Sequence, residues 1–206
     1  MLSPEALGAR YRQNLTILDQ ARERLESETR AALVGVAHVD RIAYRVKGGE
    51  SFIEKAMDAS SDPPYSDPLV EIEDQVAGRI IVFFHADIEV VRERLTGTFN
   101  SIESSRRKPA RDEEFGYESH HLVCMIPPQC VPQGWEARDD LPKTFELQIR
   151  TLFMHAWAEP QHQLGYKGSQ DLPREVRREL AWIAASAWGA DQAYGRVSGW
   201  AKGRPK

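Results

Sequence analysis

A cluster of cations surrounds a pair of glycines early in the chain. Arg45 and Lys47 alternate along a predicted strand, so their side chains share one face. The glycines at 48–49 follow, and Ser51 and Lys55 are four residues apart, which places them on one side of a helix. Cations and a hydroxyl beside a turn and a helix N-terminus suit a polyphosphate ligand. Taken alone, the same residues also fit an ordinary solvated basic face.

Two carboxylates lie at places where a strand could present them to a metal ion. Asp74 comes just before an apolar strand, at the edge of the predicted sheet, and Gly78 allows close approach to the backbone. Arg79 leads into that strand, so its charge needs a partner or a ligand. Glu146 and Gln148 share the polar face of a later strand, which indicates a strand that looks into a cleft. An ordinary polar loop with an ion pair is the alternative for the first group.

A third group stands at a junction between a loop and a strand. Tyr117 follows a glycine and suits a stacking platform for a base. Alternation places His120 and His121 on opposite faces, so at most one of them faces a site. A structural histidine remains the alternative reading of either.

The order of these segments carries more information than any one of them. Along the chain they read Arg-x-Lys-x3-Ser-x3-Lys, Asp-x3-Gly-Arg, Gly-Tyr-x-Ser-x-His, Glu-x-Gln-Ile-Arg-Thr and Trp-Ala-Glu-x2-His-x3-Tyr-Lys. This series, from Arg41 to Lys167, resembles the synthetase domain of the RelA/SpoT alarmone family. Nothing here matches the hydrolase domain or the regulatory tail of the bifunctional members, so the chain resembles a small, stand-alone synthetase.

The resemblance implies an activity and a role for each matching residue. The implied enzyme is a GTP pyrophosphokinase, which transfers the pyrophosphate group of ATP to the ribose 3′-hydroxyl of GDP or GTP and makes (p)ppGpp in the stringent response. The implied ATP-binding residues are Arg45, Lys47, Ser51, Lys55 and Arg79. The implied catalytic residues are Asp74 and Glu146, which would also hold Mg²⁺, and Glu146 is a candidate proton acceptor. The implied acceptor-binding residues are Tyr117, His121 and Gln148, and further cleft positions are Arg150, Glu159, His162 and Lys167.

The chain departs from the family pattern around the acceptor. Glu113 and Phe115 stand where synthetases that use GDP or GTP often carry lysine and asparagine, and Glu118 adds a further negative charge. Carboxylates repel acceptor phosphates. A basic run nearby either restores phosphate binding, contacts RNA or is simply solvated; it consists of Arg106, Arg107, Lys108 and Arg111. Two alternatives therefore stay open: a toxic relative that modifies the tRNA 3′ end or makes adenosine alarmones, and an inactive nucleotide- or RNA-binding module.

Composition sets the broad class of the protein. The 206 residues suit one globular domain, with 41% hydrophobic and 28% charged residues. A net charge of −4 argues against a protein that mainly coats nucleic acid. No apolar run approaches the length of a membrane span. Cys124 and Cys130 have no ligand-like spacing, so we expect free thiols in a cytoplasmic protein without membrane partners.

The elements that must position these residues can be read from periodicity and turn signals. Helices are expected at 4–33, 50–59, 87–95, 151–166 and 173–198, and strands at 38–47, 79–84, 119–126 and 145–149. Loops are expected at 60–68 and 106–116. This alternation predicts an α/β or α+β fold. With the resemblance, it implies a mixed, roughly five-stranded sheet flanked by helices, of the nucleotidyltransferase-like synthetase type.

These expected elements divide the chain into three segments. Residues 1–35 form an N-terminal helix packed on the domain, 36–168 form the synthetase core, and 169–206 form a C-terminal helix with a short basic tail. The last helix is rich in aromatic residues. These side chains either pack on the core or contact a second subunit, so a homo-oligomer is one of two expectations.

Overall fold

The computed structural model describes residues 2–58, 63–107, 115, 119–163 and 172–202. Its strands form one mixed sheet in the order β1-β2-β5-β4-β3, where β2 and β5 run parallel and every other neighbouring pair is antiparallel. The strands are β1 (Val39–Val46), β2 (Val76–Val82), β3 (Ser101–Arg107), β4 (Ser119–Met125) and β5 (Thr144–Thr151). The helices are α1 (Pro4–Ala32), α2 (Gly49–Ala56), α3 (Pro68–Glu71), α4 (His85–Thr98), α5 (Leu152–Gln163) and α6 (Arg174–Lys202), with short 3₁₀ turns η1 (Glu73–Gln75) and η2 (Pro128–Cys130). The expected mixed five-stranded sheet flanked by helices is confirmed.

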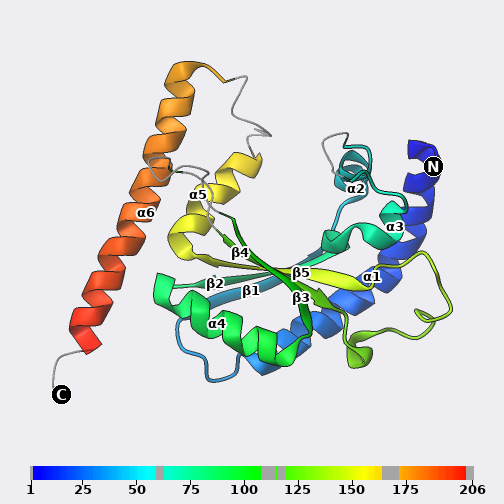
Figure 1. The fold of residues 1–206 in the computed structure, drawn as a ribbon, viewed down its shortest axis with the longest axis horizontal. Helices are drawn as coiled ribbons and strands as arrows, with labels where there is room; N and C mark the ends of the chain where they lie inside the picture. The colour runs from blue at the N-terminus through cyan, green and yellow to red at the C-terminus, as the bar shows by residue number, and fades with distance from the viewer. Residues whose placement is uncertain (1, 59–62, 108–114, 116–118, 164–171, 203–206) are drawn as a thin grey trace.

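The two faces of the sheet differ in character. Helices α1 and α4 lie along one face, whereas α5 rises from the end of β5 on the other side, with α6 beside it (Figure 1). The first face is the hydrophobic core, where Phe145, Leu147 and Ile149 of β5 are fully buried. The residues between them, Glu146 and Gln148, point to the opposite face, as their alternation predicts. This second face, called the polar face below, carries the candidate site.

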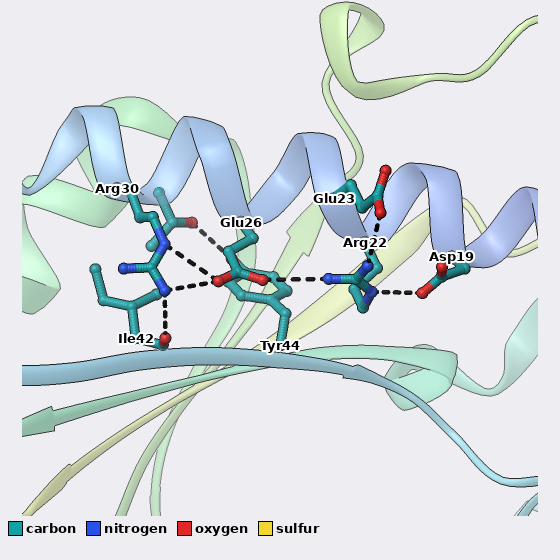
Figure 2. A network of polar contacts seen from close by, with 8 residues as sticks. Asp19, Arg22, Glu23, Glu26, Arg30, Ile42 and Tyr44 are labelled. Carbon is teal, nitrogen blue, oxygen red and sulfur yellow. Dashed lines mark hydrogen bonds and ion pairs between the residues drawn. The ribbon is translucent and has the colours of Figure 1, made fainter.

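Helix α1 is bound to the edge strand β1 by both apolar and polar contacts. The hydroxyl of Ser3 caps it by accepting from the backbone of Ala6 at 3.3 Å. Figure 2 shows the polar contacts: Arg30 pairs with Glu26 and donates to the carbonyl of Ile42 on β1 at 2.8 Å. The apolar stripe of α1 faces the core through Leu7, Tyr11, Leu18, Ala21 and Leu25. Since β1 carries Arg45, α1 fixes one wall of the site.

The last two helices pack on each other at the end of β5. The side chain of Trp157 on α5 is 9% exposed and packs with Ala184 on α6. Thr151, the last residue of β5, donates its hydroxyl to the carboxylate of Asp191 on α6 at 2.6 Å. Among the described residues, no helix is both long and apolar enough to cross a membrane.

Several predicted boundaries were wrong, and β3 was missed. Residues 101–107 form an edge strand, although the charged end of this segment was expected to be loop. The strand has a polar sequence and one neighbour only, β4, so its pairing cannot be read from hydrophobic alternation. Asp87 is the third residue of α4 rather than its N-cap, and its carboxylate accepts from the N–H of Phe84 at 3.3 Å. Strand β2 begins three residues earlier than predicted, because Val76 pairs with Val46.

Candidate active site

The polar face brings together five predicted site residues from four strands. In the register of the sheet, Arg79 on β2 lies opposite Gln148 on β5, and Gln148 lies opposite His121 on β4. Glu146 lies in the next row, beside Ala77, which in turn faces Arg45 on β1. The predicted separation of the two histidines is confirmed, because His121 contacts Glu146 while His120 lines a small pocket with His85 of α4.

Asp74 is the centre of an ion-pair cluster at one end of this face. Its two carboxylate oxygens accept from Lys47 at 2.6 Å and from Lys55 at 2.9 Å. Burial raises the pKa of Asp74, but the two lysines outweigh it, so the pKa lies below its usual value. The side chains of Lys47 and Asp74 are only 10% and 13% exposed. Two cations therefore stand ready at a nearly buried site that phosphate oxygens could share with the carboxylate.

Glu146 has partners of its own on the same face. Its carboxylate contacts the imidazole of His121 and accepts from the amide of Gln148 at 3.2 Å. Burial raises the pKa of Glu146, but the contact with His121 outweighs this effect, and the pKa lies below its usual value. The carboxyl is therefore ionised at neutral pH. The turn η1, which carries Asp74, packs against β5, which carries Glu146, and Asp74 raises the pKa of Glu146 electrostatically.

A pocket of about 160 Å³ opens on the polar face next to Glu146, because its lining includes Ala77 and Gln148, the neighbours of Glu146 on that face. Its polar lining is Arg45, Arg79, Gln148 and Glu159. The guanidinium of Arg79 is held by Glu159 of α5 at 2.6 Å. Arginine side chains lining a pocket suit the flat face of a base as well as phosphate oxygens.

The two carboxylates fit a magnesium ion by their chemistry. Both are hard oxygen donors, and Mg²⁺ is usually bound by one or two carboxylates together with waters and substrate phosphates. No cluster of three or more acidic, histidine or cysteine ligands occurs among the residues that the structure describes. A site with two protein carboxylates therefore suits Mg²⁺ with a polyphosphate better than zinc, which takes three or four protein ligands.

Most of the predicted site residues gather here. Lys47 and Lys55 both contact Asp74, whereas Ser51 is exposed on the first turn of α2. Tyr117 and Lys167 lie outside the described residues. So do four charged residues that are near Tyr117 in the sequence: Lys108, Arg111, Glu113 and Glu118. His162 belongs to α5.

Sequence reasoning missed two features of the site. His155 precedes Glu159 by one helical turn and approaches its carboxylate at 3.7 Å, and the spacing of four residues on a helix was the available signal. Phe115, at the place of the family's asparagine, packs edge-on against Trp188 of α6, with ring centroids 5.6 Å apart. This contact joins distant segments, so no local pattern could have predicted it.

Comparison with known proteins identifies the family. Residues 44–171 match the family model described as a region found in RelA / SpoT proteins. The chain is a member of the RelA/SpoT family. This range contains every site residue implied by the resemblance, and it excludes both α1 and α6.

Known RelA/SpoT relatives agree in sequence and in fold. The GTP pyrophosphokinase YjbM of Bacillus subtilis is 33% identical over 165 residues, which cover 78% of this chain and 72% of that protein. The crystal structure of small alarmone synthetase 1 from Bacillus subtilis aligns with a TM-score of 0.77 at 26% identity, covering 95% of this chain and 99% of that one. A structure of the same synthetase bound to its product pppGpp aligns with a TM-score of 0.74 at 26% identity, covering 94% and 99%.

Proposed function

We propose that this chain is a small alarmone synthetase, which transfers the pyrophosphoryl group of ATP to the ribose 3′-hydroxyl of GDP or GTP. The observation that carries the proposal is that Lys47 and Lys55 pair with Asp74 on η1, a turn that packs against β5, the strand of Glu146. This arrangement supplies cations for a polyphosphate and two carboxylates for a metal at one place. The relatives named GTP pyrophosphokinase, and the one crystallised with pppGpp, support the guanosine acceptor.

The donor half of the site is assigned from charge and shape. Lys47 and Lys55 bind the phosphates of ATP when these oxygens replace Asp74 as their partner, and Ser51 adds a hydroxyl from the first turn of α2. The pocket beside Arg45 and Arg79 takes the adenine, because guanidinium groups stack on flat aromatic rings. Glu159 keeps the guanidinium of Arg79 in place from α5.

The carboxylates take the metal and the proton. Asp74 and Glu146 would hold Mg²⁺, which supplies charge neutralisation for the phosphates. The 3′-oxygen of the acceptor attacks the β-phosphorus of ATP, the bond from that phosphorus to the α–β bridging oxygen breaks, and AMP leaves. Glu146 accepts the proton of the attacking hydroxyl, for which its carboxylate is available because it is ionised at neutral pH. Phosphoryl transfer depends on such positioning and electrostatic stabilisation.

The acceptor half rests on His121 and Gln148, which flank Glu146. We assign Tyr117 to stacking on the acceptor base, by its place in the family motif. Phe115 stands at the position where other synthetases often carry asparagine. Its ring packs against Trp188 and so connects this position to α6. We place the reaction in the cytoplasm, which the two free, buried thiols of Cys124 and Cys130 support.

A labelled transfer assay tests the proposal. Purified protein is incubated with Mg²⁺ and γ-labelled ATP, and parallel tubes hold GDP, GTP, AMP, no further acceptor or bulk tRNA. We expect label in a guanosine nucleotide, and none when Mg²⁺ is chelated. Label only in tRNA or in an adenosine nucleotide would keep the chemistry and overturn the acceptor. No transfer in any tube would contradict the proposed activity.

We further propose that α6 pairs with α6 of a second copy. Apolar and small residues recur on it at alternating spacings of three and four: Ile183, Ser186, Ala190, Ala193, Val197 and Trp200. Ile183 and Trp200, at the two ends, are 44% and 62% exposed. In an antiparallel pair, the small residues meet at the centre and each large end covers the other. The pattern is thus complementary to itself, which favours a second copy as the partner.

Size-exclusion chromatography with light scattering, which measures the molar mass of the eluting protein, tests this pairing. We expect a dimer or a larger assembly for the wild type and a smaller species for Trp200→Glu, because the charge would be buried in the pair. Val90→Glu is the control, since Val90 is a similarly exposed apolar residue on α4, at 52%. A monomeric wild type, or an equal response to both variants, would contradict the pairing.

A further inference from the structure

Tyr11 connects the N-terminal helix to the phosphate-binding end of the candidate site. It lies on α1, outside the residues that match the family model, and its side chain is fully buried. Its hydroxyl donates a hydrogen bond of 2.8 Å to the backbone carbonyl of Lys47. A buried hydroxyl needs a hydrogen-bond partner, and the partner here belongs to a residue of the candidate site.

The ring of Tyr11 makes a second contact, with the helix that carries Ser51 and Lys55. It stacks on Phe52 of α2, with ring centroids 3.8 Å apart and the planes at 2°. The N–H of Phe52 in turn donates to the carbonyl of Gly48 at 2.9 Å, which closes the first turn of α2. Tyr11 therefore contacts both sides of the turn at 47–49, through its hydroxyl and through its ring.

The turn itself has few other restraints. Gly48, the N-cap of α2, offers no side chain to cap the helix. Among the described residues other than chain neighbours, no atom lies within 4 Å of where a Cβ would stand on Gly48 or Gly49. On its other side, the N–H of Lys47 donates to the carbonyl of Gln75 at 2.8 Å. The backbone of Lys47 is thus held from two directions, by the neighbour of Asp74 and by Tyr11.

We propose that Tyr11 is a positioning residue for ATP, which fixes Lys47 and α2 so that the two lysines converge on the phosphates. The inference rests on the proposed function, since it assigns the lysines to ATP. It extends the working site beyond the family-matched residues to α1. Tyr11 acts through Lys47 and touches no substrate, so its loss should affect the donor and spare the acceptor.

Tyr11→Phe tests the proposal, because it keeps the stacked ring and removes the hydroxyl alone. We expect the KM for ATP to rise about threefold to tenfold, the range that loss of one net hydrogen bond gives. The KM for the guanosine acceptor should stay within twofold of the wild type. A purely structural role would lower the melting temperature without separating the two KM values.

Thr29→Val is the matched control. Thr29 is also on α1, also fully buried, and its hydroxyl bonds the hydroxyl of Tyr44 on β1 at 2.6 Å. This variant also removes one hydrogen bond between α1 and its neighbours, at Tyr44 rather than at Lys47, and it keeps the ring of Tyr44, which lines the pocket beside Arg45. We expect a similar loss of thermal stability and an unchanged KM for ATP. An equal rise in the KM for ATP in both variants, or no rise in Tyr11→Phe, would overturn the proposal.

Calorimetric binding of a non-hydrolysable ATP analogue separates this inference from the proposed reaction. If no acceptor is modified but Tyr11→Phe still weakens analogue binding about threefold to tenfold relative to Thr29→Val, the positioning role stands and the transfer activity fails. Unchanged binding in Tyr11→Phe, or no binding to the wild type, would overturn the positioning role itself.

Discussion

Asp74→Asn is expected to lower pyrophosphoryl transfer at least about a thousandfold, the scale on which loss of a group that stabilises transition-state charge acts. The variant removes one of two carboxylates that would hold Mg²⁺. It also leaves Lys47 and Lys55 without the anion that both now contact. The measurement is kcat/KM for each substrate in the labelled transfer assay.

Asp140→Asn is a closely matched control for this variant. The carboxylate of Asp140 is also 13% exposed, and it also pairs with two cations, Arg138 at 3.0 Å and Arg10 at 3.6 Å. Asp140 follows η2 in the chain. The side-chain amide of Asn14 on α1 donates a hydrogen bond to the backbone carbonyl of Asp140. Asp140→Asn should lose stability but keep transfer activity. Near-normal turnover in Asp74→Asn, or equal losses in both variants, would contradict the metal assignment.

Stability must be measured alongside activity, because the two effects of Asp74→Asn differ in origin. The sequence alone predicts an intact fold for Asp74→Asn and for Glu146→Gln. The structure adds that Lys47, at 9% exposure, would then lack its ion-pair partner. Breaking a buried ion pair by removing one partner is destabilising. Circular dichroism and a thermal melt will show whether enough folded protein remains at the assay temperature.

Gly78→Ala is expected to lower the free energy of unfolding by about 1–3 kcal/mol, the usual cost of overpacking a core. A Cβ at this position would stand 2.4 Å from the ring of Tyr44 and 2.8 Å from Leu147, its neighbours on β1 and β5. The ring cannot easily move away, because its hydroxyl is bonded to Thr29 at 2.6 Å. Chemical denaturation with urea measures the change.

Gly97→Ala on α4 controls for the general effect of replacing glycine. Gly97 is exposed, and nothing lies within 4 Å of where its Cβ would stand. Since alanine favours a helix over glycine by up to about 1 kcal/mol, this variant should be as stable as the wild type or more so. If Gly78→Ala were equally well tolerated, the close packing across β2 would not be essential to the fold.

The chemistry of the site was readable because it depends on residue types at short spacings. Lys47, Asp74 and Glu146 belong to local segments whose order along the chain identified the family. Strand alternation also separated His121 from His120, since a one-residue step turns a side chain to the opposite face. The same rule placed Gln148 beside Glu146.

What the sequence could not supply are contacts between distant segments. Gly78 was expected to admit a close approach to the backbone, yet the groups that approach are Tyr44 and Leu147 of the core, which only the register of three strands brings together. The polar edge strand β3 was missed because its pairing with β4 is decided by tertiary structure.

By itself, the sequence determined an α/β or α+β fold through local periodicity, and the ionisable groups of the site through residue types at short spacings. The family and the mixed five-stranded sheet followed from the resemblance of its ordered motifs to RelA/SpoT synthetases. Tertiary structure alone decided which groups pair: that Lys47 and Lys55 share Asp74, that Arg79 meets Glu159 eighty residues later, and that Tyr11 reaches the carbonyl of Lys47. Such pairs form because burial in the folded chain leaves each polar group with few partners, and these lie close in space rather than in sequence.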